Sequence, residues 1–170
     1  RTRKWKGSEV RPPSAAGRLD IGSFIKRIRH EIWNQRLLGT IGEVYHREAA
    51  FHGPSNRIIG SRDDFTAYVL SLLAMFPDLT MLTDDVLWSE DEQGRYRASV
   101  RWTLSGTHRG PGAYGPPSDR RVRVTGITND VIWNGRIVEE WMELGEFALL
   151  KQIRTLGEKS LAPGEGTCSD

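Results

Sequence analysis

Two carboxylic acids in the second half of the chain stand inside apolar segments rather than at their ends. Asp130 and Glu140 lie on either side of an Asn134-Gly135 dipeptide, in segments rich in Val, Ile and Thr. Asn-Gly between two such segments is typical of a β-hairpin, so the two carboxyls are expected to be near neighbours. Two carboxyls in an apolar environment repel each other, which raises the pKa of one of them and suits it to acid/base chemistry.

The geometry of the turn decides which carboxyl points inward. Glu139 and Glu140 are adjacent, and alternation along a strand sends one to each face of the sheet. A type I turn followed by a bulge at Gly135 would place Glu140 on the same face as Asp130. A purely structural role is the alternative, with Glu140 in a buried ion pair. Its candidate partners are Arg101, Arg123 and Arg136.

His108 is the strongest single candidate for proton transfer, because the ordinary pKa of histidine is near 6.5. It ends a predicted strand beside the Gly/Pro-rich loop 110–118. It could equally bind loop backbone and hold the turn. His52 stands at a predicted strand end in the segment F-H-G-P, where we expect it to position the segment, with ligand binding as the alternative.

The histidine and cysteine pattern does not suggest a metal or another cofactor. No H-x-H or H-x-x-x-H pair occurs, and the single cysteine, Cys168, cannot form an internal disulfide. The glycines of the 110–115 segment precede neither a helix nor a Lys-Ser/Thr pair, as a phosphate-binding loop requires. We expect no metal and no cofactor.

Hydrophobic periodicity predicts the elements that must position these groups. A helix is expected over residues 21–38, ended by Gly39, with Lys26, Arg27, Arg29 and Glu31 on its polar side. A capped helix should begin at Ser61 and end at Pro77, because Asp64 completes a capping box. The other predicted elements are a helical piece at 41–45, a strand at 49–52, strands at 79–90, 96–108, 120–132 and 136–143, and a helix at 145–156.

This order of elements predicts an α+β fold with a strongly curved antiparallel sheet. Helices across the concave face would leave a central pocket, which is the geometry that a small-molecule site prefers. The loop 110–118 resembles a lid with Tyr114 at its tip. The side chains expected to line the pocket are Trp33, Tyr45, His52, Arg101, Trp102, Tyr114, Thr128 and Met142.

Several segments, taken in order, resemble the SnoaL-like polyketide and ester cyclases of the NTF2-like superfamily. They are Y-H-R-E-A-A-F-H-G-P at 45–54, G-S-R-D-D-F at 60–65, F-P-D-L at 76–79, V-R-W-T-L-S-G-T-H-R-G at 100–110, G-P-P-S-D-R-R-V at 115–122, G-I-T at 126–128 and N-G-R-I-V-E-E-W at 134–141. The resemblance covers residues 22–155. It implies an NTF2-like cone and cofactor-independent acid/base chemistry on a small hydrophobic substrate.

The chain departs from this family at the positions that transfer the proton. The resemblance places the family's acid/base aspartate at Met142 and its polarising histidine at Thr128. Neither a thioether nor a threonine hydroxyl can serve as a base near neutral pH. The cyclase reaction is therefore not carried over. We expect Asp130 or Glu140 as the base, with His108 or Arg101 as the electrophilic partner.

Charge divides the chain into an arm, one domain and a tail. Six Lys/Arg against two acids give residues 1–20 a charge of +4, which leaves −2 on the rest. We expect a basic arm at 1–20, a SnoaL-like domain at 21–156 and a flexible tail at 157–170. The composition predicts a cytoplasmic protein that binds neither nucleic acid nor membrane.

Two functions stay open on this basis. The first is a SnoaL-like cyclase, isomerase or hydrolase that needs no cofactor. The second is a non-catalytic ligand-binding or dimerisation domain, which the Met142 and Thr128 replacements favour. In either case a homodimer through the outer face of the sheet is expected.

Overall fold

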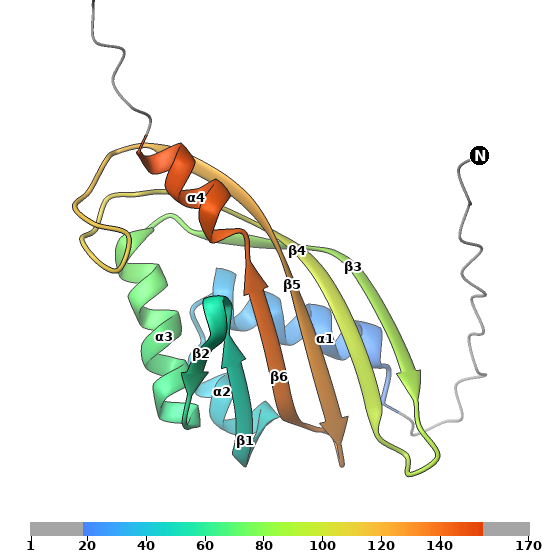
Figure 1. Ribbon diagram of the computed structural model, residues 1–170. Coiled ribbons are helices and arrows are strands. Elements are labelled where there is room, and N and C mark those ends of the chain that lie inside the picture. Colours follow the sequence, from blue (N-terminus) through green and yellow to red (C-terminus); the bar gives the residue numbers. More distant parts are fainter. Residues whose placement is uncertain (1–18, 155–170) are drawn as a thin grey trace, which may run out of the picture.

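The computed structural model describes residues 19–154, which form four α-helices around one six-stranded sheet (Figure 1). The strands lie in the order β2-β1-β6-β5-β4-β3. The helices are α1 (Ile21–Arg29), continued by a π-helical turn η1 (His30–Asn34), α2 (Gly39–Val44), α3 (Arg62–Met75) and α4 (Glu146–Ile153). The strands are β1 (Tyr45–Gly53), β2 (Arg57–Ile59), β3 (Thr80–Glu90), β4 (Tyr96–Thr107), β5 (Arg121–Trp133) and β6 (Arg136–Leu144), and a 3₁₀ turn η2 (Pro54–Asn56) joins β1 to β2.

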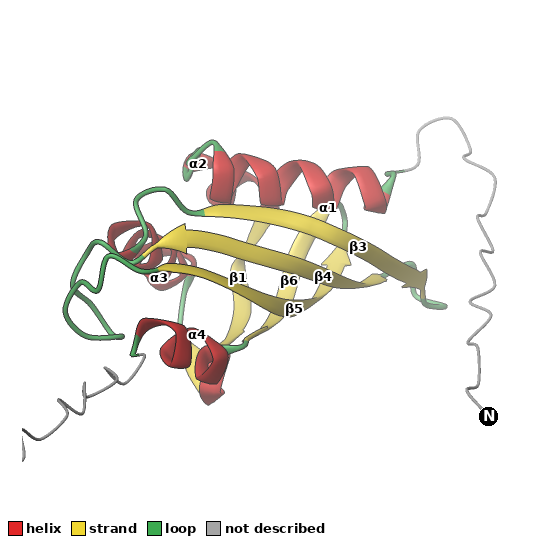
Figure 2. Cartoon of the chain, turned by 90° about the horizontal axis from the view of Figure 1, so that it is seen from above, coloured by secondary structure: helices red, strands yellow, loops and turns green. Residues whose placement is uncertain are grey.

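The predicted fold class is confirmed. Strands β3 to β6 form a continuous antiparallel meander, and α1 passes behind it in Figure 1 and along one face of it in Figure 2. One pairing differs from the prediction, because β1 runs parallel to β6. The sheet is therefore mixed. The pattern of residues 49–52 predicted a strand but held no information on its partner, and β2 was not predicted.

Helix α3 forms as its sequence predicts. The Ser61 hydroxyl accepts from the Asp64 backbone N–H and donates to the Asp64 carboxylate, 2.8 Å away. Its buried positions include Phe65, Val69 and Leu72, which face the core at helical spacing. This cap and this apolar stripe fix α3 against β1.

The first helix is shorter than predicted, and the role assigned to Gly39 was wrong. Regular α-helix ends at Arg29, and Gly39 begins α2 instead of ending α1. Tertiary contacts explain the break. The Asn34 side chain donates to the Met81 carbonyl at 2.9 Å and accepts from the Met81 N–H at 2.7 Å. The helix end is thereby attached to β3, which periodicity alone does not show.

The β5–β6 hairpin orients Glu140, by a different route from the predicted one. Asn134 and Gly135 both have positive φ, 49° and 73°, as in a two-residue type I′ turn. The bulge comes later, because Ile132 pairs with Ile137 while Val131 pairs with Glu139. The extra residue shifts the register by one position. Asp130 consequently stands directly opposite Glu140, and both are buried.

None of the helices in residues 19–154 is both long enough and apolar enough to cross a membrane.

Candidate functional site

A buried arginine from α1 joins the two carboxylates of the hairpin. Arg29 Nη2 lies 2.9 Å from Asp130 Oδ2 and 3.2 Å from Glu140 Oε2. Its Nη1 also donates to Glu140 at 3.4 Å. The guanidinium therefore bridges two strands from the helix above them. We call Asp130 and Glu140 the acid pair.

Tyr45, the first residue of β1, completes this cluster. Its phenol hydroxyl donates to Glu140 Oε2 at 2.5 Å. Arg29, Asp130, Glu140 and Tyr45 are each at most 1 % exposed. The sealed cluster holds one positive charge and two acidic groups, so it is closer to neutrality with one proton on the acid pair.

The environment shifts the titration of this cluster. Burial raises the pKa of Asp130 to about 7, with the Arg29 charge opposing the rise and the Glu140 charge adding to it. Burial and the neighbouring Glu140 charge also raise the pKa of Tyr45, which keeps that phenol a hydrogen-bond donor. A carboxyl that binds and releases a proton near pH 7 can act as either general acid or general base.

A tryptophan occupies the inner face next to the acid pair. Thr128 pairs with Met142, two residues along the strands from the Asp130–Glu140 pair and on the same inner face of the sheet. The Trp102 indole Nε1 donates to the Thr128 hydroxyl at 2.8 Å. The indole passes over Gly126, where an added Cβ would lie 2.2 Å from it. Trp102 thus packs against the position where the family resemblance expected a histidine.

His108 is not brought to the acid pair. Asp130 pairs with Ala98 on β4, and His108 follows ten residues later, roughly 30 Å along an extended strand. The His108 ring packs 5.3 Å from Phe76, and its Nδ1 lies 3.2 Å from the Ser118 hydroxyl. Burial lowers its pKa. These contacts match the alternative in which His108 holds the loop.

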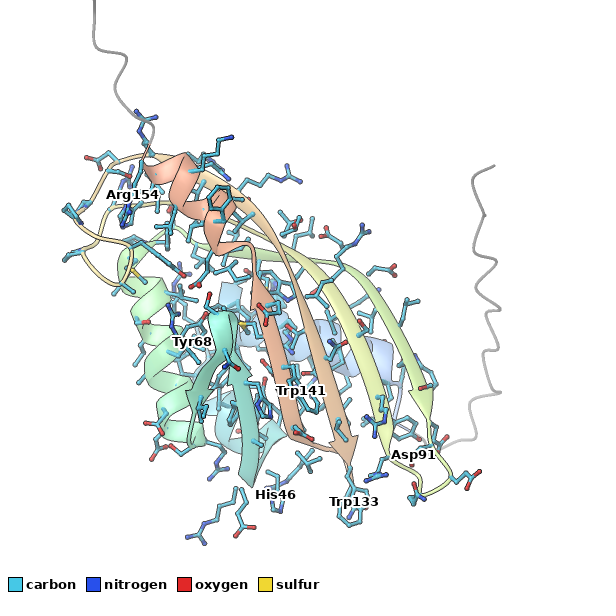
Figure 3. All side chains as sticks on the ribbon, viewed as in Figure 1. His46, Tyr68, Asp91, Trp133, Trp141 and Arg154 are labelled. Atoms are coloured by element: carbon cyan, nitrogen blue, oxygen red, sulfur yellow. The ribbon has the colours of Figure 1, made fainter. Side chains whose placement is uncertain are left out.

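Arg101 and His52 also lie away from the acid pair. Arg101 is exposed on the outer face, in a hollow that Glu143 also lines. The predicted ion-pair partners of Glu140 were wrong, because Arg101, Arg123 and Arg136 are all exposed. His52 is exposed too and stacks on Trp141 with ring centroids 5.0 Å apart. Figure 3 shows Trp141 on the face opposite to α1.

Arg29 is the central residue that the sequence reasoning missed, since it was assigned to the polar side of its helix. The signal was present, because Arg29 lies four residues after Ile25 and three before Ile32, both fully buried. Those spacings put it on the apolar stripe. A charge in that stripe predicts a buried counter-charge elsewhere in the chain.

The remaining predicted lining residues divide between the core and one end of the fold. Trp33 and Trp102 are buried in the core. Tyr114 is buried in the loop between β4 and β5, and its hydroxyl donates to Glu146 at 2.8 Å. Within residues 19–154, no three His, Cys, Asp or Glu side chains gather closely enough to hold a metal ion.

A surface hollow of about 450 Å³ opens on the outer face of the sheet. Trp141, Leu87, Asn129 and Arg97 are among the residues that line it. Asp130 borders it as well, but its fully buried carboxylate points to the opposite face. The outer hollow and the acid pair are therefore separated by the thickness of the sheet.

The curved mixed sheet, with α1 across its inner face, defines an NTF2-like α+β protein. The sequence matches the family model of SnoaL-like polyketide cyclases over residues 24–153, and the chain belongs to that family. No curated protein sequence matches it.

Solved structures agree on the fold. A putative SnoaL-like polyketide cyclase from Jannaschia sp. CCS1 is 21 % identical, with a TM-score of 0.69 over 78 % of this chain and 90 % of that one. AclR, a putative hydroxylase from Streptomyces galilaeus, is 20 % identical with a TM-score of 0.67, over 81 % and 82 % of the two chains. IdmH, a putative polyketide cyclase from Streptomyces antibioticus, is 24 % identical with a TM-score of 0.65, over 78 % and 96 %.

Proposed function

We propose that the protein is a cofactor-independent enzyme that moves protons on a small hydrophobic substrate, with Asp130 as acid and base. The observation that carries this proposal is the buried acid pair, in which Asp130 has a pKa raised to about 7. A purely structural ion pair does not require a carboxyl with a raised pKa, because one arginine and one carboxylate already balance in charge. The second carboxylate leaves one proton to exchange.

The expected step is removal of a proton from a carbon next to a carbonyl group. Asp130 takes the proton, the C–H electron pair forms the enolate, and Asp130 then returns a proton to the enolate oxygen, to the same carbon or to another carbon. In D₂O the proton held by Asp130 can be replaced by deuterium before it is returned. Arg29 and Tyr45 stay bound to Glu140 and hold its charge in place. The reaction consumes no oxidant, reductant or metal.

Exchange of ketone protons for deuterium tests this step directly. A flat aromatic ketone such as 2-tetralone is incubated with the protein in D₂O, and loss of the α-proton signal is followed by NMR. Asp130→Asn should slow the catalysed exchange by about 100-fold or more. Glu139→Gln is the matched control, because Glu139 is the sequence neighbour of Glu140 on the other face, and it should leave the rate unchanged. Exchange no faster than in buffer alone, on this ketone and on related aromatic ketones, would count against an enzyme.

A non-catalytic domain is the second candidate, and the Trp102 contact favours it. The indole fills space beside Thr128 and Met142, and the acid pair is sealed from solvent. Such a domain would bind a ligand and be stabilised by it without chemistry. A ligand that raises the unfolding temperature but is recovered unaltered supports this candidate over the enzyme.

The outer face of the sheet supports our expectation of a homodimer. Leu82, Leu87, Ile127 and Trp141 are exposed there, although apolar side chains on a sheet face are normally covered. The single cysteine, Cys168, fits a reducing cytoplasmic compartment.

A further inference from the structure

A second polar cluster closes one end of the fold. Glu146, the first residue of α4, accepts from Tyr114 at 2.8 Å and pairs with Arg57 Nη2 at 3.2 Å. The Ser55 hydroxyl donates to it as well. These four residues, which we call the Glu146 cluster, connect η2, β2, the β4–β5 loop and α4. One carboxylate therefore holds together segments that are far apart in the sequence.

The Glu146 carboxylate is well matched to this role. Burial opposes its charged form, but hydrogen bonds from Ser55 and Tyr114 and the charge of Arg57 hold its pKa below the ordinary value. It stays charged at neutral pH. All four groups lie in turns or at the ends of elements, where segments separate at lower cost than within a sheet.

Tyr68 lies on α3 (Figure 3), which packs against β1, and it is within electrostatic reach of Arg57, Tyr114 and Glu146. Its hydroxyl is buried, and among the described residues it has no hydrogen-bond partner. Burial raises the pKa of Tyr68, and the charges of Glu146 and Glu140 raise it further. A buried donor without an acceptor is costly, so the position of this hydroxyl calls for an explanation.

Tyr68 also lies within electrostatic reach of the acid pair, because the charge of Glu140 acts on its hydroxyl. Phe65 lies one helical turn before Tyr68, and its ring centroid is 5.2 Å from that of Tyr45. The Tyr45 hydroxyl in turn donates to Glu140. Tyr68 thus stands between the Glu146 cluster at the surface and the acid pair inside.

We propose that ligands reach the acid pair past Tyr68, through an entrance that the Glu146 cluster holds closed, and that the Tyr68 hydroxyl donates a hydrogen bond to the ligand. The inference rests on the proposed function only for the chemistry at the inner end. The entrance itself can be tested without any turnover.

Cysteine labelling measures whether the entrance opens. With Cys168→Ser removing the single native cysteine, Tyr68→Cys is labelled with iodoacetamide under native conditions. Ala98→Cys is the matched control, because Ala98 is 3 % exposed and pairs with Asp130 across β4 and β5. Residue 68 should be labelled at least ten times faster than residue 98. Adding Glu146→Gln should accelerate labelling at residue 68 at least fivefold and leave residue 98 unchanged.

Equal slow rates at both positions would overturn the entrance, because labelling would then need global unfolding. Equal acceleration at both by Glu146→Gln would do the same. Neither result depends on whether the protein is an enzyme, so failure of the proposed function is seen separately in the deuterium exchange of the ketone.

The ligand contact is tested with Tyr68→Phe and Tyr114→Phe. Tyr68→Phe removes an unpaired hydroxyl, so the unfolding temperature should stay equal or rise, while KM for 2-tetralone exchange should rise at least fivefold with kcat nearly unchanged. Tyr114→Phe removes a donor from Glu146 and should lower the unfolding temperature. A fall in the unfolding temperature of Tyr68→Phe with unchanged KM would assign Tyr68 a structural role and contradict the contact. If exchange is absent from the start, binding of 2-tetralone by calorimetry replaces KM, with the same expected fold-change.

Discussion

Among residues 19–154, Arg29 is the one cation bonded to both members of the acid pair, so the charge balance of the interior depends on it. Removing one partner from a buried charge cluster leaves the others without compensation. The proton that the acid pair retains near pH 7 follows from the same imbalance of charge. Stability and the proposed acid/base chemistry therefore depend on the same few atoms.

Arg29→Met should lower the free energy of unfolding by about 3–5 kcal/mol at pH 7, because it leaves two buried carboxyls facing each other. Arg27→Met is the control on the same helix. Arg27 is exposed and pairs with Glu31 four residues away, and such pairs contribute only about 0.3–0.5 kcal/mol. Urea denaturation measures both losses. Similar losses for the two variants would show that the buried cluster contributes little.

Asp130 should make stability depend on pH in an unusual direction for a carboxyl. Its pKa in the folded protein is raised from 3.8 to about 7, so the folded state binds more protons than the unfolded state between those values. The free energy of unfolding then falls as pH rises from about 4 to about 7, and this contribution is constant above that. Comparison with Asp130→Asn isolates it, with an expected difference of roughly 1–4 kcal/mol across that window. A difference that grows in favour of the native chain as pH rises would contradict the raised pKa.

Local signals in the sequence predicted those elements whose boundaries are set by neighbouring residues. Ser61 and Asp64 predicted the start of α3, and Asn134-Gly135 predicted the last hairpin. Where a distant segment sets the boundary, the prediction failed. The first helix ends where Asn34 bonds to Met81 on β3, and no pattern within the helix contains that information.

The candidate site divides in the same way. Asp130 opposite Glu140 was predictable because both belong to one hairpin. Arg29, 101 residues away from Asp130, required a long-range argument from a charge in an apolar stripe. The bulge at Val138 turns Glu140 inward. The sequence predicted the inward carboxyl but placed the bulge in the turn, because type I′ turns and bulged turns both accept Asn-Gly.

Gly126 is required for the packing of β5 against Trp102. A Cβ there would meet the indole at 2.2 Å and the Glu143 carbonyl at 2.6 Å. Because the Trp102 ring is buried and bonded to Thr128, it has little room to move. Gly126→Ala should cost about 1–3 kcal/mol through overpacking, as measured by thermal and urea unfolding.

Gly42→Ala is the control for the same chemical change. Gly42 is exposed in α2, with nothing within 4 Å of an added Cβ. Alanine favours helix over glycine by about 0.5–1 kcal/mol, so this variant should be equal or more stable. A destabilised Gly42→Ala together with an unaffected Gly126→Ala would contradict the packing argument.

Across the whole molecule, the sheet separates two environments. Its inner face carries the acid pair beneath α1, and its outer face leaves apolar side chains exposed on β3, β5 and β6. Charges on the outer face are arranged by strand, with Arg97 and Arg101 on β4 and Glu139 and Glu143 on β6. Strand β5 lies between β4 and β6. A two-fold axis that runs parallel to β5, above the outer face, would therefore bring the arginines of one copy to the glutamates of the other.

Ile127 on β5 is the residue that such an axis would bury, and it is 47 % exposed in the single chain. Ile127→Glu would place two carboxylates at the centre of the interface, so it should convert a dimer of twice 19.2 kDa to a 19.2 kDa monomer in light scattering. Phe147→Glu is the control, because Phe147 is 83 % exposed on α4 and should not change the mass. We expect a higher salt concentration to weaken the proposed dimer only moderately, since apolar burial would supply most of its affinity and the charges would mainly set the orientation of the two copies. A native chain that is monomeric at 100 μM, or a dimer that Phe147→Glu disrupts and Ile127→Glu does not, would place the interface elsewhere or remove it.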